Sequence, residues 1–110
     1  MEAVTLSEVV DEQMAAARVA HSGRAAHTVH GGQGHFLRHT VIALVAGQGL
    51  GEHDSTGEAT LQVLRGRVVL LAGDESQTGS AGDLLVIPPM RHALDAVEDS
   101  AVLLTVLADR

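Results

Sequence analysis

From residue 24 onward, the chain consists of short apolar runs separated by turns rich in glycine. Two runs within residues 24–46 flank the turn Gly31-Gly32-Gln33-Gly34, and a tight strand pair is expected around Arg65-Gly66. Many short strands at close spacing are typical of an all-β sandwich or barrel. After the first two runs, the predicted strands cover residues 59–64, 67–71, 77–79, 84–87, 92–97 and 101–107.

The first part of the chain has a helical pattern instead. Its apolar residues recur at steps of three and four and therefore share one helical face. They are Leu6, Val9, Val10, Met14, Ala17 and Ala20. Thr5 and Glu8 have the spacing of a capping box, and Ser22-Gly23 supplies a stop signal. We expect a short amphipathic helix that packs as a lid on the β-structure or on a partner subunit.

Two later segments each place a histidine at the end of a predicted strand. The turn Gly47-Gln48-Gly49 leads to His53 and a polar loop, and the apolar run that follows ends at Gly66. The second segment begins at Gly82, contains the apolar run 84–87, stops at Pro88-Pro89 and reaches His92. Each half of the β-region therefore offers one histidine at the mouth of a β-structure.

The spacing of these segments resembles the two motifs of the cupin family, small β-barrels of the jelly-roll type. The matching positions are Gly47, His53, Gly66, Gly82 and Pro88. Ser55, Ala59, Met90 and Ala96 stand where the motifs have a second histidine, a glutamate, a glycine and an asparagine, and His92 comes one residue early. The resemblance covers about the last two thirds of the chain. Together with the helical pattern of the first part of the chain, it predicts a helix and cap over residues 1–23 and a cupin barrel over residues 24–110.

The resemblance also implies a metal centre of three histidines and one glutamate around iron, manganese, nickel or zinc. His53 and His92 would supply two ligands, whereas Ser55 and Ala59 do not replace the missing ones. Glu58, beside the vacant glutamate position, is the first substitute, with Asp54 a weaker one. His39 is a further candidate, because a simple hairpin at Gln48 would put residues 39, 41, 43 and 45 on the face of His53.

A metal-free barrel is the alternative interpretation, and there the two histidines recognise a small molecule through hydrogen bonds. The expected pocket combines His53 and His92 with Arg91 at the rim, for an anionic ligand, and with apolar walls. Those walls are Met90, Leu61 and Val63. Three hypotheses remain open: a small-molecule-binding cupin with or without a divalent metal, a metal-dependent oxygenase or isomerase, and a non-catalytic module that binds a partner protein.

Four further histidines lie near the first turn: His27, His30, His35 and His39. His27 and His30 have opposite parity on a strand, as do His30 and His35, and alternate residues point to opposite faces. Apart from His39, we therefore interpret this group as surface histidines rather than as a metal site.

Composition narrows the class of partner. The 110 residues carry a formal charge of −7 without any lysine, so the chain lacks the basic surface that nucleic acid requires. There is no cysteine, which removes disulfides and thiolate ligands, and no apolar segment approaches the ~20 residues that span a bilayer. We expect a soluble cytoplasmic protein. Phe36 is the only aromatic residue, which disfavours ligands that are held by ring stacking.

A homodimer is also expected, since a barrel of this size leaves an edge or apolar strand face to cover. Residues 40–45 are apolar on both parities, which indicates a strand covered on both faces or one in a dimer interface.

Overall fold

A computed structural model describes residues 1–54 and 57–107, which form one helix and nine strands. These elements confirm the predicted all-β architecture with a short N-terminal helix. In chain order they are α1 (Leu6–Val19), β1 (Arg24–His30), β2 (Leu37–Leu44), β3 (Gly49–His53), β4 (Glu58–Arg65), β5 (Arg67–Ala72), β6 (Glu75–Ser80), β7 (Leu84–Ile87), β8 (His92–Ala96) and β9 (Ser100–Leu107).

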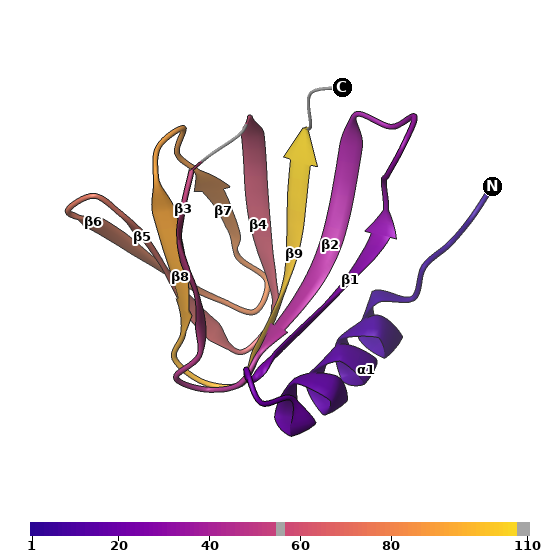
Figure 1. The fold of residues 1–110 in the computed structure, drawn as a ribbon, viewed down its shortest axis with the longest axis horizontal. Helices are drawn as coiled ribbons and strands as arrows, with labels where there is room; N and C mark the ends of the chain where they lie inside the picture. Colours follow the sequence, from indigo (N-terminus) through magenta and orange to yellow (C-terminus); the bar gives the residue numbers. More distant parts are fainter. Residues whose placement is uncertain (55–56, 108–110) are drawn as a thin grey trace.

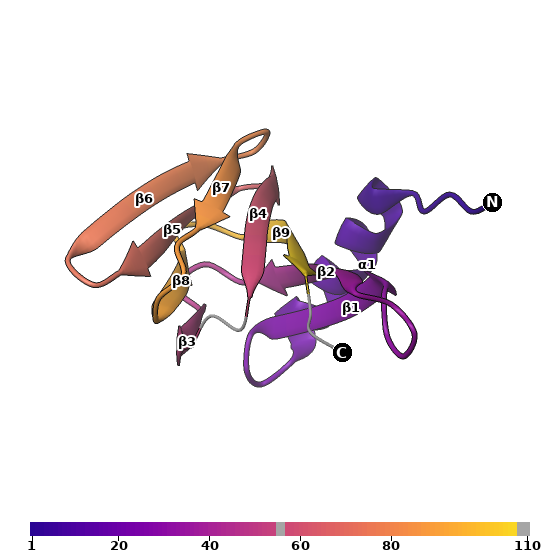
Figure 2. The same ribbon diagram turned by 90° about the horizontal axis from the view of Figure 1, so that it is seen from above.

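The strands form two antiparallel sheets that face each other (Figure 1). The five-stranded sheet has the order β1-β2-β9-β4-β7, and the four-stranded sheet has the order β3-β8-β5-β6. The hairpin of β5 and β6 extends away from the body of the molecule, as Figure 2 shows from above. Most neighbours within a sheet are distant in sequence, so the chain crosses repeatedly between the two layers.

The main core lies between the two sheets and is aliphatic. Alternation along each strand directs every second side chain inward. Leu61 and Val63 of β4 are in this core, with Ala59 packed against it, which confirms the inward parity predicted for that run. The other core members are Ile42, Leu44, Val68, Leu70, Leu85, Ile87, Leu94, Ala96 and Val102.

Helix α1 covers part of the outer face of the five-stranded sheet. Val10 packs against Val41 and Ala101, and Met14 packs with Ala17 against Ala43. The second half of β2 is therefore buried on both faces, since Ile42 and Leu44 point into the main core. This arrangement explains why residues 40–45 are apolar on both parities: the chain's own helix provides the second cover. Among the described residues, no helix has the length and hydrophobicity needed to cross a membrane.

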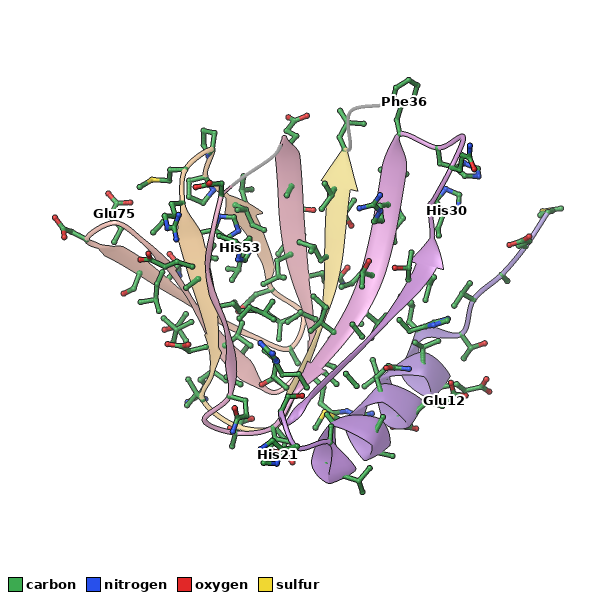
Figure 3. The ribbon with its side chains drawn as sticks, viewed as in Figure 1. Glu12, His21, His30, Phe36, His53 and Glu75 are labelled. Carbon is green, nitrogen blue, oxygen red and sulfur yellow. The ribbon has the colours of Figure 1, made fainter. Side chains whose placement is uncertain are left out.

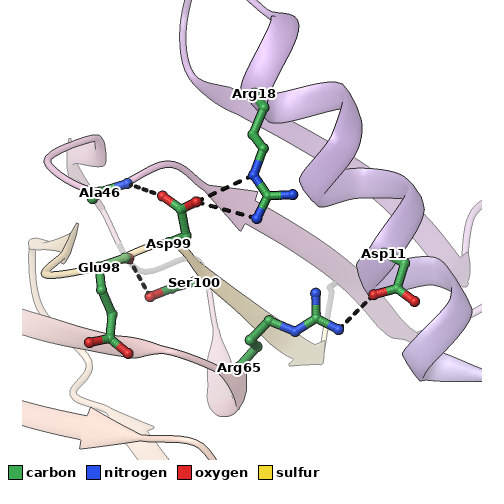
Figure 4. A network of polar contacts seen from close by, with 7 residues as sticks. All are labelled: Asp11, Arg18, Ala46, Arg65, Glu98, Asp99 and Ser100. Carbon is green, nitrogen blue, oxygen red and sulfur yellow. Dashed lines mark hydrogen bonds and ion pairs between the residues drawn. The ribbon is translucent and has the colours of Figure 1, made fainter.

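Two ion pairs connect helix α1 to the β8–β9 turn and to β4 (Figure 4). Arg18 contacts the Asp99 carboxylate, with Nη2 and Oδ2 3.3 Å apart, and Arg65 contacts Asp11 at 2.7 Å. The other carboxylate oxygen of Asp99 accepts the backbone N–H of Ala46 at 2.9 Å. This hydrogen bond, supported by Arg18, lowers the pKa of Asp99 below its usual value.

Three local predictions were wrong. Thr5 is the helix N-cap, but its side chain makes no capping hydrogen bond. Arg65-Gly66 does not close a hairpin, because β4 and β5 belong to different sheets. Strands β2 and β3 do not pair either, since β2 lies between β1 and β9 while β3 pairs with β8. In both cases a short turn carries the chain from one layer to the other, which strand spacing alone does not distinguish from a hairpin.

Candidate small-molecule site

The structure brings His53 and His92 together on neighbouring strands. They are direct cross-strand partners in the β3–β8 pair, and their ring centres lie 4.3 Å apart at an interplanar angle of 67°. On β8, His92 shares the inward parity of Leu94 and Ala96. Leu50 and His53 are three residues apart and would point to opposite faces of a regular strand. An irregularity in β3 between them turns His53 to the inner face, the same side as His92. Figure 3 shows the His53 side chain directed into the space between the sheets.

Both imidazoles are anchored in the same way. Nδ1 of His53 lies 2.9 Å from the Gly51 carbonyl oxygen, and Nδ1 of His92 lies 2.9 Å from the Met90 carbonyl oxygen. A carbonyl oxygen only accepts, so each Nδ1 must carry the hydrogen and donate. In the neutral ring, Nε2 then keeps its lone pair. Two Nε2 atoms are therefore available as acceptors or ligands, each on a ring whose orientation the backbone fixes.

The two histidines of the pair differ in solvent exposure. His92 is 6% exposed, whereas His53 is exposed. Leu50, Ala59 and Leu104 pack against the main core but are only partly buried. An apolar pattern gives the side of a strand and not the depth along it, so the sequence alone did not mark these partly buried residues.

The apolar walls expected from the sequence are placed elsewhere. Leu61 is 2% exposed and Val63 is fully buried, so both are sealed within the main core. Met90 is exposed, and its Cε lies 3.2 Å from where a Cβ on Gly73 would stand, over the turn between β5 and β6. What Met90 contributes to the pair is its carbonyl oxygen.

Arg91 is already paired with acidic residues. Its Nε lies 3.1 Å from Glu52, and its Nη1 lies 3.5 Å from Asp54. All three side chains are exposed, so these ion pairs contribute little stability. They offset the positive charge of Arg91, which was expected from the sequence to recognise an anion.

The four candidate metal ligands do not gather at one point. Glu58 begins β4 with the parity opposite to Ala59 and Leu61, so it lies on the outer face of the five-stranded sheet. His39 is also in that sheet, where its Nδ1 lies 3.0 Å from the Thr105 hydroxyl. The predicted register failed because β2 and β3 are in different layers. Within residues 1–54 and 57–107, no three histidine, aspartate or glutamate side chains form a group that could hold a metal ion. Ser55 lies outside the described residues.

A second group of rings lies on the other side of the molecule. His30 and His39 are cross-strand partners, and His30 stands 4.9 Å from His35 and 6.0 Å from His39 between ring centres. Strand parity did not predict the contact of His30 with His35 because residues 31–36 are not strand, and a register shift between Thr28 and His30 places His30 opposite His39. His27 is exposed, as predicted for a surface histidine.

Solved structures show what the fold is similar to. A conserved protein of unknown function from Streptococcus pyogenes has a TM-score of 0.73 and 30% identity over 83% of this chain and 79% of that chain. An RmlC-like cupin protein from Desulfovibrio desulfuricans has a TM-score of 0.74 and 26% identity, over 97% and 96%. Salicylate 1,2-dioxygenase from Pseudaminobacter salicylatoxidans has a TM-score of 0.76 and 20% identity; the match covers 91% of this chain but 33% of that one.

That dioxygenase also matches in a structure of its adducts with gentisate, with a TM-score of 0.73. No protein-family model matches the sequence, and no curated protein matches it.

Proposed function

Because this chain belongs to the cupin superfamily, we propose that it binds a small organic molecule at the open end of its barrel, through His53 and His92. The observation that carries the proposal is the common anchoring of the two rings. Each Nδ1 donates to a backbone carbonyl two residues earlier, which leaves two Nε2 atoms on neighbouring rings for a ligand.

The chemistry of the pair suggests a class of ligand. Neutral Nε2 atoms accept hydrogen bonds, so the ligand presents donors such as hydroxyl groups. Ala59 and Leu104, which are only partly buried on the inner side of the facing sheet, would add apolar contact for the rest of the molecule. We propose a small hydroxylated compound. Gentisate, found with the cupin-fold dioxygenase, has this chemistry and serves as a first probe.

A complete cupin metal centre does not fit the described residues. The two imidazoles are suitable ligands in kind, but Glu58 and His39 lie in the other sheet and supply no third group. Two neutral nitrogens alone hold a divalent ion weakly, and metal sites in proteins usually take at least three protein ligands. The proposed recognition therefore depends on the imidazoles themselves.

Metal analysis separates this proposal from a metal-dependent oxygenase or isomerase. Protein purified without chelator and incubated with iron, manganese, nickel or zinc should hold less than about a tenth of an equivalent after desalting. A stoichiometric metal that is lost in the His53→Ala variant would support the enzyme instead, and would contradict recognition by imidazoles alone.

Ligand binding is tested by protein-observed NMR with gentisate and a panel of small hydroxy acids. The expected result is that at least one compound shifts the imidazole signals of His53 and His92, and that His53→Ala abolishes its binding. His53 is exposed, so this variant should keep the fold. His27→Ala, on an exposed position of β1, is the matched control and should bind normally. Unchanged binding to His53→Ala would place the site elsewhere.

A further inference from the structure

The inner face of the four-stranded sheet continues past the histidine pair onto strands β5 and β6. His53 lies opposite His92. The register of β8 with β5, continued by one residue beyond its last pair, places His92 opposite Ala72. Ala72 lies opposite Glu75, at the start of β6 (Figure 3). Directly opposite residues point to the same face, so these four side chains form one row across the sheet.

Two core contacts show that this row faces the interior between the sheets. Leu70, two residues before Ala72 on β5, belongs to the main core. A Cβ on Gly79, four residues after Glu75 on β6, would lie 3.2 Å from Cγ2 of Val63, which is also in that core. The β5–β6 register has no shift, and residues at even separations on a strand share a face. Ala72 and Glu75 therefore point to the same side as the two imidazoles.

A cleft of 570 Å³ lies at the Glu75 end of the row, between the β5–β6 hairpin and β7. Its lining includes the apolar residues Leu70, Ala72 and Pro88 and the polar residues Glu75, Gln77 and Asp83. Ala72 belongs both to this lining and to the row. Only a methyl side chain therefore stands between the cleft and His92.

The polar groups of the cleft favour a cation. Among the described residues that line it there are two carboxylates, Glu75 and Asp83, and no arginine or histidine. Asp83 Oδ2 already accepts the Ser80 N–H at 2.8 Å. Glu75 is exposed, and within residues 1–54 and 57–107 no hydrogen bond or ion pair engages its carboxylate. A protonated amine would both neutralise this charge and donate to it through a charge-assisted hydrogen bond.

We propose that the ligand of the histidine pair is a hydroxylated amine, with its hydroxyl group at the Nε2 atoms of His53 and His92 and its ammonium group at Glu75. This inference rests on the proposed function, because the hydroxyl end uses the same imidazoles. His92 and Glu75 are two strands apart, which corresponds to about 10 Å. A linear amino alcohol such as 6-aminohexan-1-ol has a suitable length, and the partly buried Ala72 and Pro88 offer contact to its aliphatic chain.

Three probes of equal chain length test the proposal by protein-observed NMR titration of the full chain. 6-Aminohexan-1-ol should bind about tenfold or more tightly than hexan-1-ol, which lacks the ammonium group. 6-Hydroxyhexanoate should bind more weakly than either, because its carboxylate would face Glu75. The probes that bind should shift the imidazole signals of His53 and His92.

Two variants of the hairpin separate a specific contact from general attraction to an acidic protein. Glu75→Gln should lower the affinity for 6-aminohexan-1-ol about tenfold and leave that for hexan-1-ol unchanged. Asp74→Asn is the matched control, since it removes the same charge from the neighbouring exposed position, outside the cleft lining. It should keep the wild-type preference for the amine. Both positions are exposed, so both variants should fold, which far-UV circular dichroism checks.

Equal affinity of the wild type for 6-aminohexan-1-ol and hexan-1-ol would overturn the inference, and would leave the proposed function standing if both probes shift the imidazole signals. A Glu75→Gln variant that keeps the amine preference, or an Asp74→Asn variant that loses it equally, would also overturn it, as would the absence of binding by all three probes. Binding that depends on Glu75 but persists in His53→Ala without imidazole shifts would contradict the proposed function and, with it, a ligand that bridges the two ends.

Discussion

At the scale of single residues, the site depends on a contact that side-chain chemistry alone does not reveal. Each histidine donates to the carbonyl oxygen two positions before it, Gly51 for His53 and Met90 for His92. The chain must bend locally for a ring to reach back over so short a distance. The irregularity in β3 and the turn after Pro88-Pro89 provide that bend. The backbone at the strand ends thus sets both the direction and the tautomer of the rings.

Gly66 is a residue whose replacement should be costly for two separable reasons. Its φ is +82°, and a Cβ there would meet the Asp99 carbonyl oxygen and the Ser100 hydroxyl. Left-handed strain and the clash together should make Gly66→Ala less stable by about 2–4 kcal/mol in urea unfolding.

Gly47 is the matched control for this prediction, because its φ is +83° and a Cβ there would have no neighbour within 4 Å. Gly47→Ala should show the strain alone, about 1 kcal/mol. If the two variants lose the same free energy of unfolding, the close contact of Gly66 with Asp99 and Ser100 does not contribute to stability.

The sequence predicted which two histidines converge but not the residues around them. Glycine, histidine and proline spacing selected His53 and His92, because strand length and turn position are encoded locally. The carbonyl partners involve main-chain atoms that any residue has, so no residue type marks them. Leu61 and Val63 were correctly assigned to the inner side of the sheet. Their complete burial depends on how the two sheets pack against each other, which the local sequence does not give.

At the scale of elements, strand positions followed from the sequence and strand partners did not. The runs that became β4, β7 and β9 were predicted close to their observed bounds, since apolar runs and turn residues are local signals. Pairing is set by non-local contacts. Residues 59–64 and 67–71 look like a hairpin because Gly66 fits a tight turn, but each strand pairs within a different sheet.

Helix α1 should contribute to stability through burial rather than through helix propensity. Met14 is fully buried against the outer side of β2, so Met14→Ala should lower the free energy of unfolding by about 2–5 kcal/mol. Glu12→Ala, exposed on the same helix, should change it by less than about 0.5 kcal/mol. Thermal and urea unfolding measure both. A loss for Met14→Ala no larger than that for Glu12→Ala would show that the helix is not packed as described.

The contact between helix and sheet should depend on pH through Asp99. Its pKa is lowered in the folded protein, chiefly by the Ala46 N–H and further by Arg18, so the ionised carboxylate stabilises the fold. That contribution is fully present above the unfolded pKa of about 3.9, and it is lost as the pH falls through the folded value. The urea midpoint of Asp99→Asn should therefore lie below that of wild type at pH 7, and the difference should shrink near pH 3. A difference that is the same at both pH values would contradict this assignment.

At the scale of the whole molecule, two sheets enclose an aliphatic core, and two anchored imidazoles lie on its inner side at neighbouring strand ends. Because Phe36 is the only aromatic residue, the proposed ligand would be recognised through hydrogen bonds and aliphatic contact. The fold is that of the cupin superfamily, and two of the four departures from the family's motifs, Ser55 and Ala59, fall on metal-ligand positions. This combination is what favours recognition without a complete metal centre.

The most direct test of this account is the tautomeric state of His53 and His92 when their imidazole rings are uncharged. It is measured by long-range ¹H–¹⁵N correlation of the ring nitrogens. The account predicts that both rings carry hydrogen on Nδ1 and an unprotonated Nε2, while the exposed His27 need not share this state. Nε2-protonated rings at His53 and His92 would contradict it, because the carbonyl anchors would then be absent and no pair of lone pairs would face the ligand.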